Sequence, residues 1–153
     1  MVDVGTDHAR LPLWLLQNGV TTDITAVDIA DGPLQKAIAL TEYVGLREQL
    51  RILKADGLTM LCEDDCDTVI IAGMGGDSII KILNDSPWSL QKHLLLQPMS
   101  RADRVLDYLQ SENIIPAEAR VLDGRREFVI YECGQPPAAS SGTPFQKGIG
   151  VKI

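Results

Sequence analysis

The fold is decided by the first eleven residues, MVDVGTDHARL (residues 1–11). They predict a short buried strand, a turn that contains Gly5, and a helix whose first turn accommodates Pro12. A strand-to-helix turn of this type presents free backbone N–H groups and the positive end of a helix dipole to a ligand. The pattern D-x-G-x-D at residues 3–7 is a weak signal alone. It gains weight because Asp28 and Asp56 follow the next two predicted strands, which would bring acidic side chains to one edge of a sheet.

The rest of the chain repeats this alternation of strand and helix. Strands are predicted at residues 24–28, 50–54, 68–72 and 94–96, and helices at residues 8–18, 31–44 and 77–84, with a further helix capped by Ser100. Residues 114–122 and 127–133 predict a hairpin that turns at Asp123-Gly124. The order predicts an α/β fold, a doubly wound Rossmann-like sheet that is mostly parallel, with an antiparallel C-terminal hairpin and a ligand cleft at the strand ends.

Helical spacing also predicts which side chains face the core. In the first helix these are His8, Leu11, Trp14 and Leu15, and in the second they are Leu34, Ala37, Ile38 and Tyr43. Trp14 and Trp88 are expected to be packing residues. In the helix that follows Ser100, the inward side chains are expected to be Val105, Leu106 and Leu109.

Composition sets limits on the class of protein. The chain has 153 residues, 45% of them hydrophobic, which suits one globular domain. It contains no long apolar run and no basic leader, so we expect a cytoplasmic protein without a membrane span. Three cysteines without a paired C-x-x-C pattern predict reduced thiols and no metal. The net charge of −7 gives no polyanion-binding footprint, although arginines are concentrated late in the chain, at Arg101, Arg104, Arg120, Arg125 and Arg126.

The acidic residues at the strand ends suggest a nucleoside ligand. Asp28 is placed to accept two ribose hydroxyls, and Asp56 to accept the exocyclic amine of an adenine. Gly5 permits close approach of the backbone to the ligand. The dinucleotide fingerprint G-x-G-x-x-G is absent, because Asp7 stands where its second glycine would be. A carboxylate there repels a pyrophosphate and attracts a sulfonium, which favours S-adenosylmethionine over NAD; alternatively, Asp7 caps the following helix.

Several motifs occur in an order and spacing that resemble the TrmK family of bacterial tRNA (adenine(22)-N1)-methyltransferases. They are DVGTDHA-x-LP at residues 3–12, DGP at 31–33, ADGL at 55–58, IAGMGG at 71–76 and LLQP at 95–98. The resemblance covers roughly residues 1–133. It implies a class I methyltransferase that transfers a methyl group from S-adenosylmethionine to N1 of an adenine in tRNA.

The resemblance also implies roles for individual residues. Asp7, His8 and Met74 would position the substrate. Cofactor contacts are implied for Asp3, Gly5, Asp7, Asp28, Asp56 and Gly57, and we include Thr6, Ile29, Ala72 and Gly73 in the predicted cofactor site. Adenine N1 already carries a free lone pair, so positioning matters more than general-base catalysis, and the base must be unpaired before reaction. The product is cationic, and a carboxylate such as Asp7 or Asp77 would stabilise the developing charge.

Other interpretations of these residues remain open from sequence. His8 can instead satisfy its own helix start, Met74 can merely fill a gap beside the strand, and the five arginines can form salt links instead of contacting tRNA phosphates. The family has a helix before the first strand and a coiled-coil extension after the catalytic domain. We therefore expect residues 1–133 to form the domain without its leading helix, and residues 134–153 to be a flexible tail. The alternatives to an active enzyme are a non-catalytic RNA-binding module and, less favoured, an NAD(P)-linked oxidoreductase; the sequence sets no oligomeric state.

Overall fold

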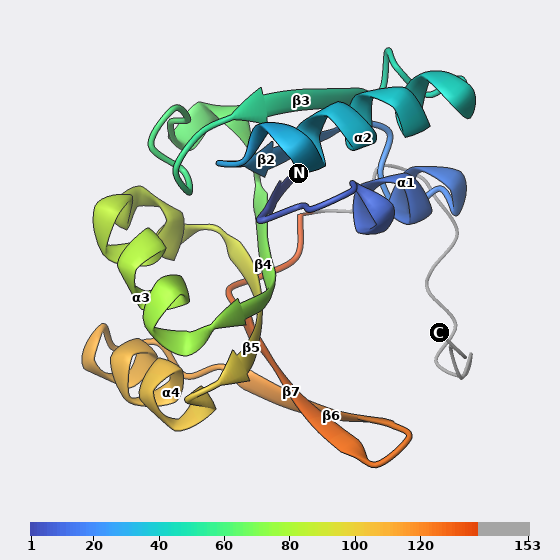
Figure 1. Cartoon of the computed structure of the whole chain (residues 1–153). Helices are drawn as coiled ribbons and strands as arrows, with labels where there is room; N and C mark the ends of the chain where they lie inside the picture. The colour runs from blue at the N-terminus through green and yellow to red at the C-terminus, as the bar shows by residue number, and fades with distance from the viewer. Residues whose placement is uncertain (138–153) are drawn as a thin grey trace.

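The computed structural model describes residues 1–137, which form one sheet with helices on both faces (Figure 1). The strands follow the order β3-β2-β1-β4-β5-β7-β6 across the sheet. Their bounds are β1 Val2–Val4, β2 Ile24–Asp28, β3 Leu50–Lys54, β4 Thr68–Gly75, β5 His93–Ser100, β6 Ala117–Asp123 and β7 Arg126–Cys133. The first five strands pair in parallel, and β7 is antiparallel to both β5 and β6. The predicted fold class is confirmed.

Four helices and two short 3₁₀ turns connect the strands. The helices are α1 Arg10–Gln17, α2 Asp31–Tyr43, α3 Gly76–Asp85 and α4 Ala102–Ser111, and the turns are η1 Glu63–Asp65 and η2 Pro87–Gln91. Helices α1 and α2 pack on β1–β3, while α3 and α4 pack on the opposite face (Figure 1). Successive residues of a buried strand therefore enter different cores, as Ile70 and Ile71 do. This explains why β4 begins as a continuous apolar run.

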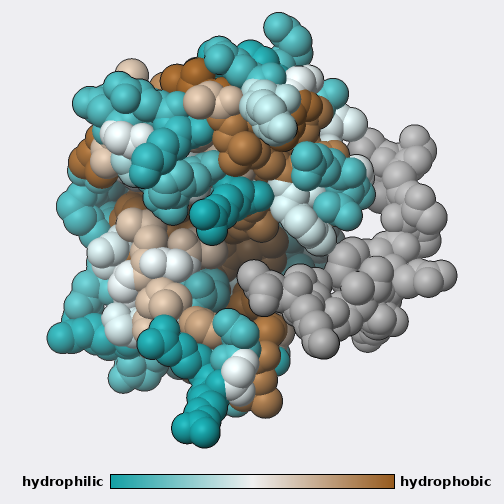
Figure 2. Space-filling view, turned by 45° about the vertical axis from the view of Figure 1, so that its right-hand side comes forward, coloured by the Kyte–Doolittle hydropathy of each residue, from teal (hydrophilic) through white to brown (hydrophobic). Residues whose placement is uncertain are grey.

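The β6–β7 hairpin projects away from the body of the sheet (Figure 1). All seven residues of β6 are exposed, because among residues 1–137 β6 is the edge strand and pairs with β7 alone. Figure 2 shows polar residues over much of the outer surface and apolar residues gathered in a recess across the middle of the view. Within residues 1–137 no helix is both long and apolar enough to cross a bilayer.

Several local predictions were wrong, and each failed where tertiary contacts outweighed local pattern. Ser100 does not cap α4, because it is the last residue of β5; the N-cap is Arg101, with a φ of 55°. The strand predicted from Ile114 begins three residues later, at Ala117, because the backbone N–H of Ile114 closes the end of α4 on the Leu109 carbonyl at 2.8 Å.

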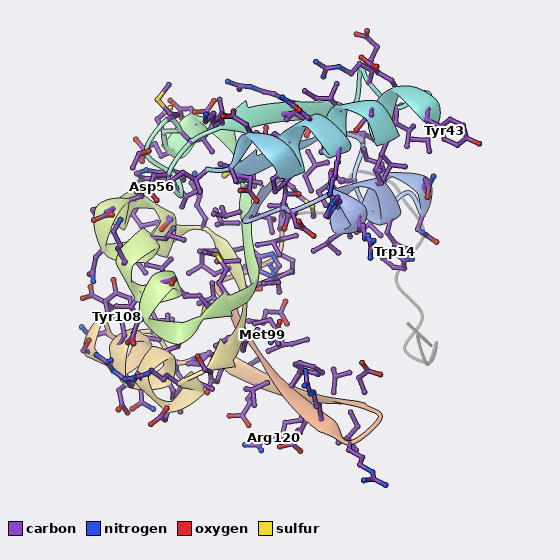
Figure 3. All side chains as sticks on the ribbon, in the orientation of Figure 1. Trp14, Tyr43, Asp56, Met99, Tyr108 and Arg120 are labelled. Atoms are coloured by element: carbon purple, nitrogen blue, oxygen red, sulfur yellow. The ribbon has the colours of Figure 1, made fainter. Side chains whose placement is uncertain are left out.

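The predicted inward faces of the first two helices were also partly wrong. α1 buries Pro12, Leu13, Leu15 and Leu16, while Leu11 and Trp14 are exposed. Tyr43 is 88% exposed at the end of α2 and points away from the body (Figure 3), whereas Thr41 is buried in its place. Trp88 does pack against the larger core, as predicted. Cys62, Cys66 and Cys133 are all free thiols.

Candidate functional site

The β1–α1 turn is shaped by Gly5. The N–H groups of Gly5 and Thr6 both donate to the Val27 carbonyl oxygen, at 2.8 and 3.0 Å, which draws the turn onto the end of β2. Gly5 has a φ of 73°, and a Cβ atom there would lie 3.0 Å from the Sδ atom of Met74. Glycine is therefore favoured by the backbone conformation, and a larger residue would also press on the end of the Met74 side chain.

A cavity of about 270 Å³ opens beside this turn, at the carboxyl ends of the central strands. It lies where doubly wound sheets bind their ligands. Its walls are Val4, Gly5, Val27, Asp28, Ile29, Ala55, Asp56, Gly57, Met74 and Ile82. A more open hollow of about 400 Å³ lies on the surface beside Arg47 and Arg51, away from these strand ends.

Gly57 shapes the opposite wall of the cavity, in the loop after β3. Its φ is 59°, and a Cβ atom there would lie 3.0 Å from Cγ1 of Ile82, a buried residue of α3. The neighbouring Asp56 lies on the same loop, above α3 (Figure 3). Its carboxylate is 58% exposed and shares the ammonium of Lys81 with Asp85. Asp56 thus combines a backbone held close to the core with a carboxylate open to solvent.

Asp28 ties together the two turns at the mouth of the cavity. Its Oδ2 atom accepts the backbone N–H of Asp7 at 3.1 Å, and its Oδ1 atom accepts the backbone N–H of Ala30 at 2.9 Å. A carboxylate offers about four lone-pair sites, so Asp28 keeps acceptor capacity for further hydroxyl donors. Asp28 therefore organises the backbone in addition to lining the cavity.

Asp7 and His8 form a pair beside the cavity, not in its wall. His8 Nδ1 lies 2.5 Å from the Oδ2 atom of Asp7, whose side chain is 66% exposed. Asp7 has a φ of 51°, a conformation that aspartate tolerates better than most residues. The capping alternative for Asp7 was wrong, because α1 begins at Arg10 and its N-cap, Ala9, has no side-chain hydrogen bond.

Asp3 lies inside β1 and is almost completely buried, with 4% of its surface exposed. Burial is the largest cause of the raised pKa of the Asp3 carboxyl, the charge of Asp28 adds to it, and the resulting pKa is about 6. The Thr6 hydroxyl lowers the pKa, although its Oγ1 atom meets hydrogen-bond geometry with no group in residues 1–137. Asp3 is thus a buried carboxyl that lies outside the cavity lining and is coupled electrostatically to Asp28.

The structure brings together part of the predicted site. Gly5, Asp28, Ile29, Asp56, Gly57 and Met74 line the cavity, while Asp3, Thr6, Asp7, His8, Ala72 and Gly73 do not. Sequence reasoning missed Val4, Val27, Ala55 and Ile82. The first three could have been predicted, because each directly precedes a predicted site residue at the end of a strand. Ile82 carried no signal, because it reaches the cavity only through the packing of α3.

The acidic and basic residues near α4 largely neutralise one another. Asp77 pairs with Arg104 and with the Nε atom of Arg101, the latter at 3.3 Å. Arg120 pairs with Glu118 at 2.7 Å and Glu127 at 2.8 Å, along the hairpin. Of the five arginines singled out from sequence, Arg125 and Arg126 alone form no ion pair within the part of the chain that the structure describes. No cluster of metal-binding side chains occurs within residues 1–137.

The fold and the strand-end cavity agree with a comparison against protein families. A methyltransferase-domain family matches residues 1–131. The chain belongs to this family.

Comparison with individual proteins shows which methyltransferases this chain resembles. A tRNA (adenine(22)-N(1))-methyltransferase of Bacillus subtilis (strain 168) is 32% identical over 156 residues, covering 99% of this chain and 66% of the relative. The crystal structure of the B. subtilis m1A22 tRNA methyltransferase TrmK matches with a TM-score of 0.81 and 29% identity, covering 87% of this chain and 58% of that one.

A third relative was solved with a ligand. It is M. capricolum TrmK in complex with its natural cofactor product S-adenosyl-homocysteine, with a TM-score of 0.77 and 26% identity over 86% of this chain and 60% of that one. This methyltransferase-domain chain therefore spans just under two thirds of the length of the relatives it matches. The resemblance to the TrmK family that the motifs indicated is confirmed by these similarities.

Proposed function

We propose that this chain binds S-adenosylmethionine in the cavity at the ends of β1, β2 and β4, and transfers its methyl group to N1 of an adenine in tRNA. The observation that carries the proposal is the cavity itself. Two glycines in its walls have positive φ and leave only crowded space for a Cβ atom, and two carboxylates, of Asp28 and Asp56, line the cavity. The similarity to tRNA m1A22 methyltransferases supplies the reaction and the substrate class.

The residues present fit this cofactor. Asp28 would accept the ribose hydroxyls with the lone pairs that its two backbone hydrogen bonds leave free. Asp56 would accept the adenine amine, because its carboxylate is exposed at the cavity wall. Gly5 and Gly57 would let the backbone approach the ligand closely, and Met74 and Ile82 would supply apolar contact. The cofactor, when bound, supplies an electrophilic methyl group.

The remaining catalytic work is positioning. An adenine N1 has a free lone pair, so no residue has to remove a proton before attack. Asp77, one of the two carboxylates considered for the cationic product, is already balanced by Arg101 and Arg104. Asp7 is the better candidate, and His8 would hold its carboxylate in place through the Nδ1 contact.

Contact with tRNA is proposed for the exposed end of the β6–β7 hairpin. Arg125 and Arg126 lie at its turn and carry no ion pair within residues 1–137, whereas Arg101, Arg104 and Arg120 are each paired with carboxylates. Unpaired guanidinium groups are the ones that gain most from a phosphate. We further propose that residues 1–133 constitute the catalytic domain and that it acts in the cytoplasm, where tRNA is met. The predicted flexible tail lies largely outside the described residues.

The proposal is tested in two steps on the whole chain. Isothermal titration with S-adenosylmethionine should show one site, with NAD as a control that should not bind. Incubation with unmodified tRNA and the cofactor should then produce a reverse-transcription stop at one adenine. Lack of cofactor binding at millimolar concentration would refute the cofactor assignment. Binding without a stop on any tRNA would refute the activity and favour a non-catalytic module.

A further inference from the structure

The pairing of β4 with β5 is irregular at the edge of the cavity. Ala72 pairs with Gln97 and Met74 with Pro98, and the register shifts on both sides of Met74. Gly73 is the residue between, with a φ of 76°, and apart from its chain neighbours no atom of the described residues lies within 4 Å of the place where its Cβ would be. The position thus requires glycine for its backbone conformation, as a β-bulge commonly does.

A side chain supplies the hydrogen bond at this bulge. The backbone N–H of Gly73 donates to Oε1 of Gln97 at 3.0 Å, and the Nε2 atom of Gln97 donates to the Pro98 carbonyl at 3.1 Å. The amide of Gln97 is therefore held at both ends. Within residues 1–137, β7 pairs with β5 only from Leu94 to Leu96, so Gln97 lies just beyond the end of that pairing.

The bulge determines where the side chain of Met74 goes. Met74 follows Gly73 directly, lines the cavity, and places its Sδ atom where a Cβ on Gly5 would collide. A chain of contacts therefore runs from Gln97 through the backbone of Gly73 to Met74 and the β1–α1 turn. Met is flexible and holds no position by itself, so the backbone that carries it must be fixed.

We propose that Gln97 is a positioning residue of the cavity: its Oε1 atom holds the β4 bulge at Gly73 and thereby keeps Met74 in the cavity wall. That the cavity binds S-adenosylmethionine rests on the proposed function, but the hydrogen bond from Gly73 to Gln97 does not depend on it. Gln97 is not among the residues that line the cavity, and it acts through Gly73 and Met74.

Three variants test this inference. Gln97→Leu removes the acceptor at similar volume, Gln97→Glu keeps an acceptor oxygen for Gly73 but loses the donor to Pro98, and Gln110→Ala changes an exposed glutamine on α4 as a control. In the protein without ligand, hydrogen exchange of the Gly73 amide should be faster in Gln97→Leu and near wild type in Gln97→Glu. The Met74 methyl resonance should move only in Gln97→Leu.

Titration with S-adenosylmethionine then measures the consequence for binding. Gln97→Leu should bind about tenfold more weakly, Gln97→Glu within about threefold of wild type, and Gln110→Ala like wild type. Met74→Ala should weaken binding in the wild type and add little in Gln97→Leu, because the two act in one chain of contacts.

Two results would overturn the inference. One is an unmoved Met74 methyl resonance in Gln97→Leu; the other is wild-type cofactor affinity in that variant despite a faster Gly73 amide. If the wild-type chain bound no S-adenosylmethionine, the proposed function would fail, and the exchange and methyl measurements would still decide whether Gln97 positions Met74.

Discussion

Gly57→Ala tests most directly whether the cavity is shaped as the structure shows. The new Cβ atom would lie 3.0 Å from Cγ1 and 3.2 Å from Cγ2 of Ile82, and Ile82 is only 5% exposed and cannot swing into solvent. The variant therefore has two costs: a backbone cost, because alanine is disfavoured at a φ of 59°, and a crowding cost in the core.

Gly124→Ala separates these two costs. Gly124 lies in the β6–β7 turn with a φ of 60°, and a Cβ atom there would meet no atom of residues 1–137 within 4 Å apart from its chain neighbours. Both variants have the same backbone cost of about 1 kcal/mol, partly offset by the reduced entropy of the unfolded chain. Only Gly57→Ala adds crowding, at about 1–2 kcal/mol. We therefore expect a loss of up to about 1 kcal/mol in the free energy of unfolding for Gly124→Ala and about 2 kcal/mol for Gly57→Ala.

Urea unfolding gives the free-energy difference between the two variants, and calorimetric titration gives their affinities for S-adenosylmethionine. Gly57→Ala should bind at least about tenfold more weakly, because a displaced Ile82 changes the cavity wall, while Gly124→Ala should bind like wild type. Equal destabilisation of the two variants together with unchanged affinity in both would refute the assignment of this cavity wall.

The other predictions concern the charged groups around the cavity and the hairpin. Asp28→Asn should reduce the free energy of unfolding by about 1–3 kcal/mol and abolish tight cofactor binding, because the amide NH₂ would face a backbone N–H of Asp7 or Ala30. Urea unfolding measures the loss of stability, and calorimetric titration measures the loss of binding. A variant as stable as wild type would contradict the two hydrogen bonds. The pKa of Asp3 is raised from 3.8 to about 6, so the native state holds its proton more tightly than the unfolded state, and the stability contributed by Asp3 is complete below pH 4 and lost as pH rises through 6. Between pH 5 and 7 the free energy of unfolding of the wild type should therefore fall by about 1 kcal/mol relative to that of Asp3→Asn. Parallel plots of unfolding free energy against pH for the two proteins would rule this out. The double substitution Arg125→Ala with Arg126→Ala should weaken tRNA binding and flatten its salt dependence. Arg120→Ala should do so less, because Arg120 is already paired with two glutamates. Filter binding at several salt concentrations measures both effects, and a larger effect of Arg120→Ala would exclude the hairpin turn as a phosphate contact.

Local sequence was sufficient for the elements that carry the cavity. The bounds of β2 and β3 were predicted to the residue, because a buried strand between turn residues is a strong local pattern. The carboxylates of Asp28 and Asp56 were also placed correctly at strand ends, since all parallel strands end at the same edge of the sheet. Helix faces were less predictable: residues 11–16 are all apolar, so the local pattern does not define which side of α1 is buried, and packing leaves Trp14 exposed.

What the sequence by itself determined was the order of strands and helices, the α/β class, and the turns on which most cavity residues stand. Only the tertiary structure decided which atoms meet across those turns. Ile82 closes the cavity against Gly57, Gln97 holds Gly73, and Arg101 and Arg104 neutralise Asp77. Each of these contacts joins residues more than twenty positions apart, and local propensity carries no information about such partners. The physical reason is that the pairing of a strand, the position of a bulge and the buried face of a helix all depend on residues that are close only in space. Those residues come together only when the sheet is assembled.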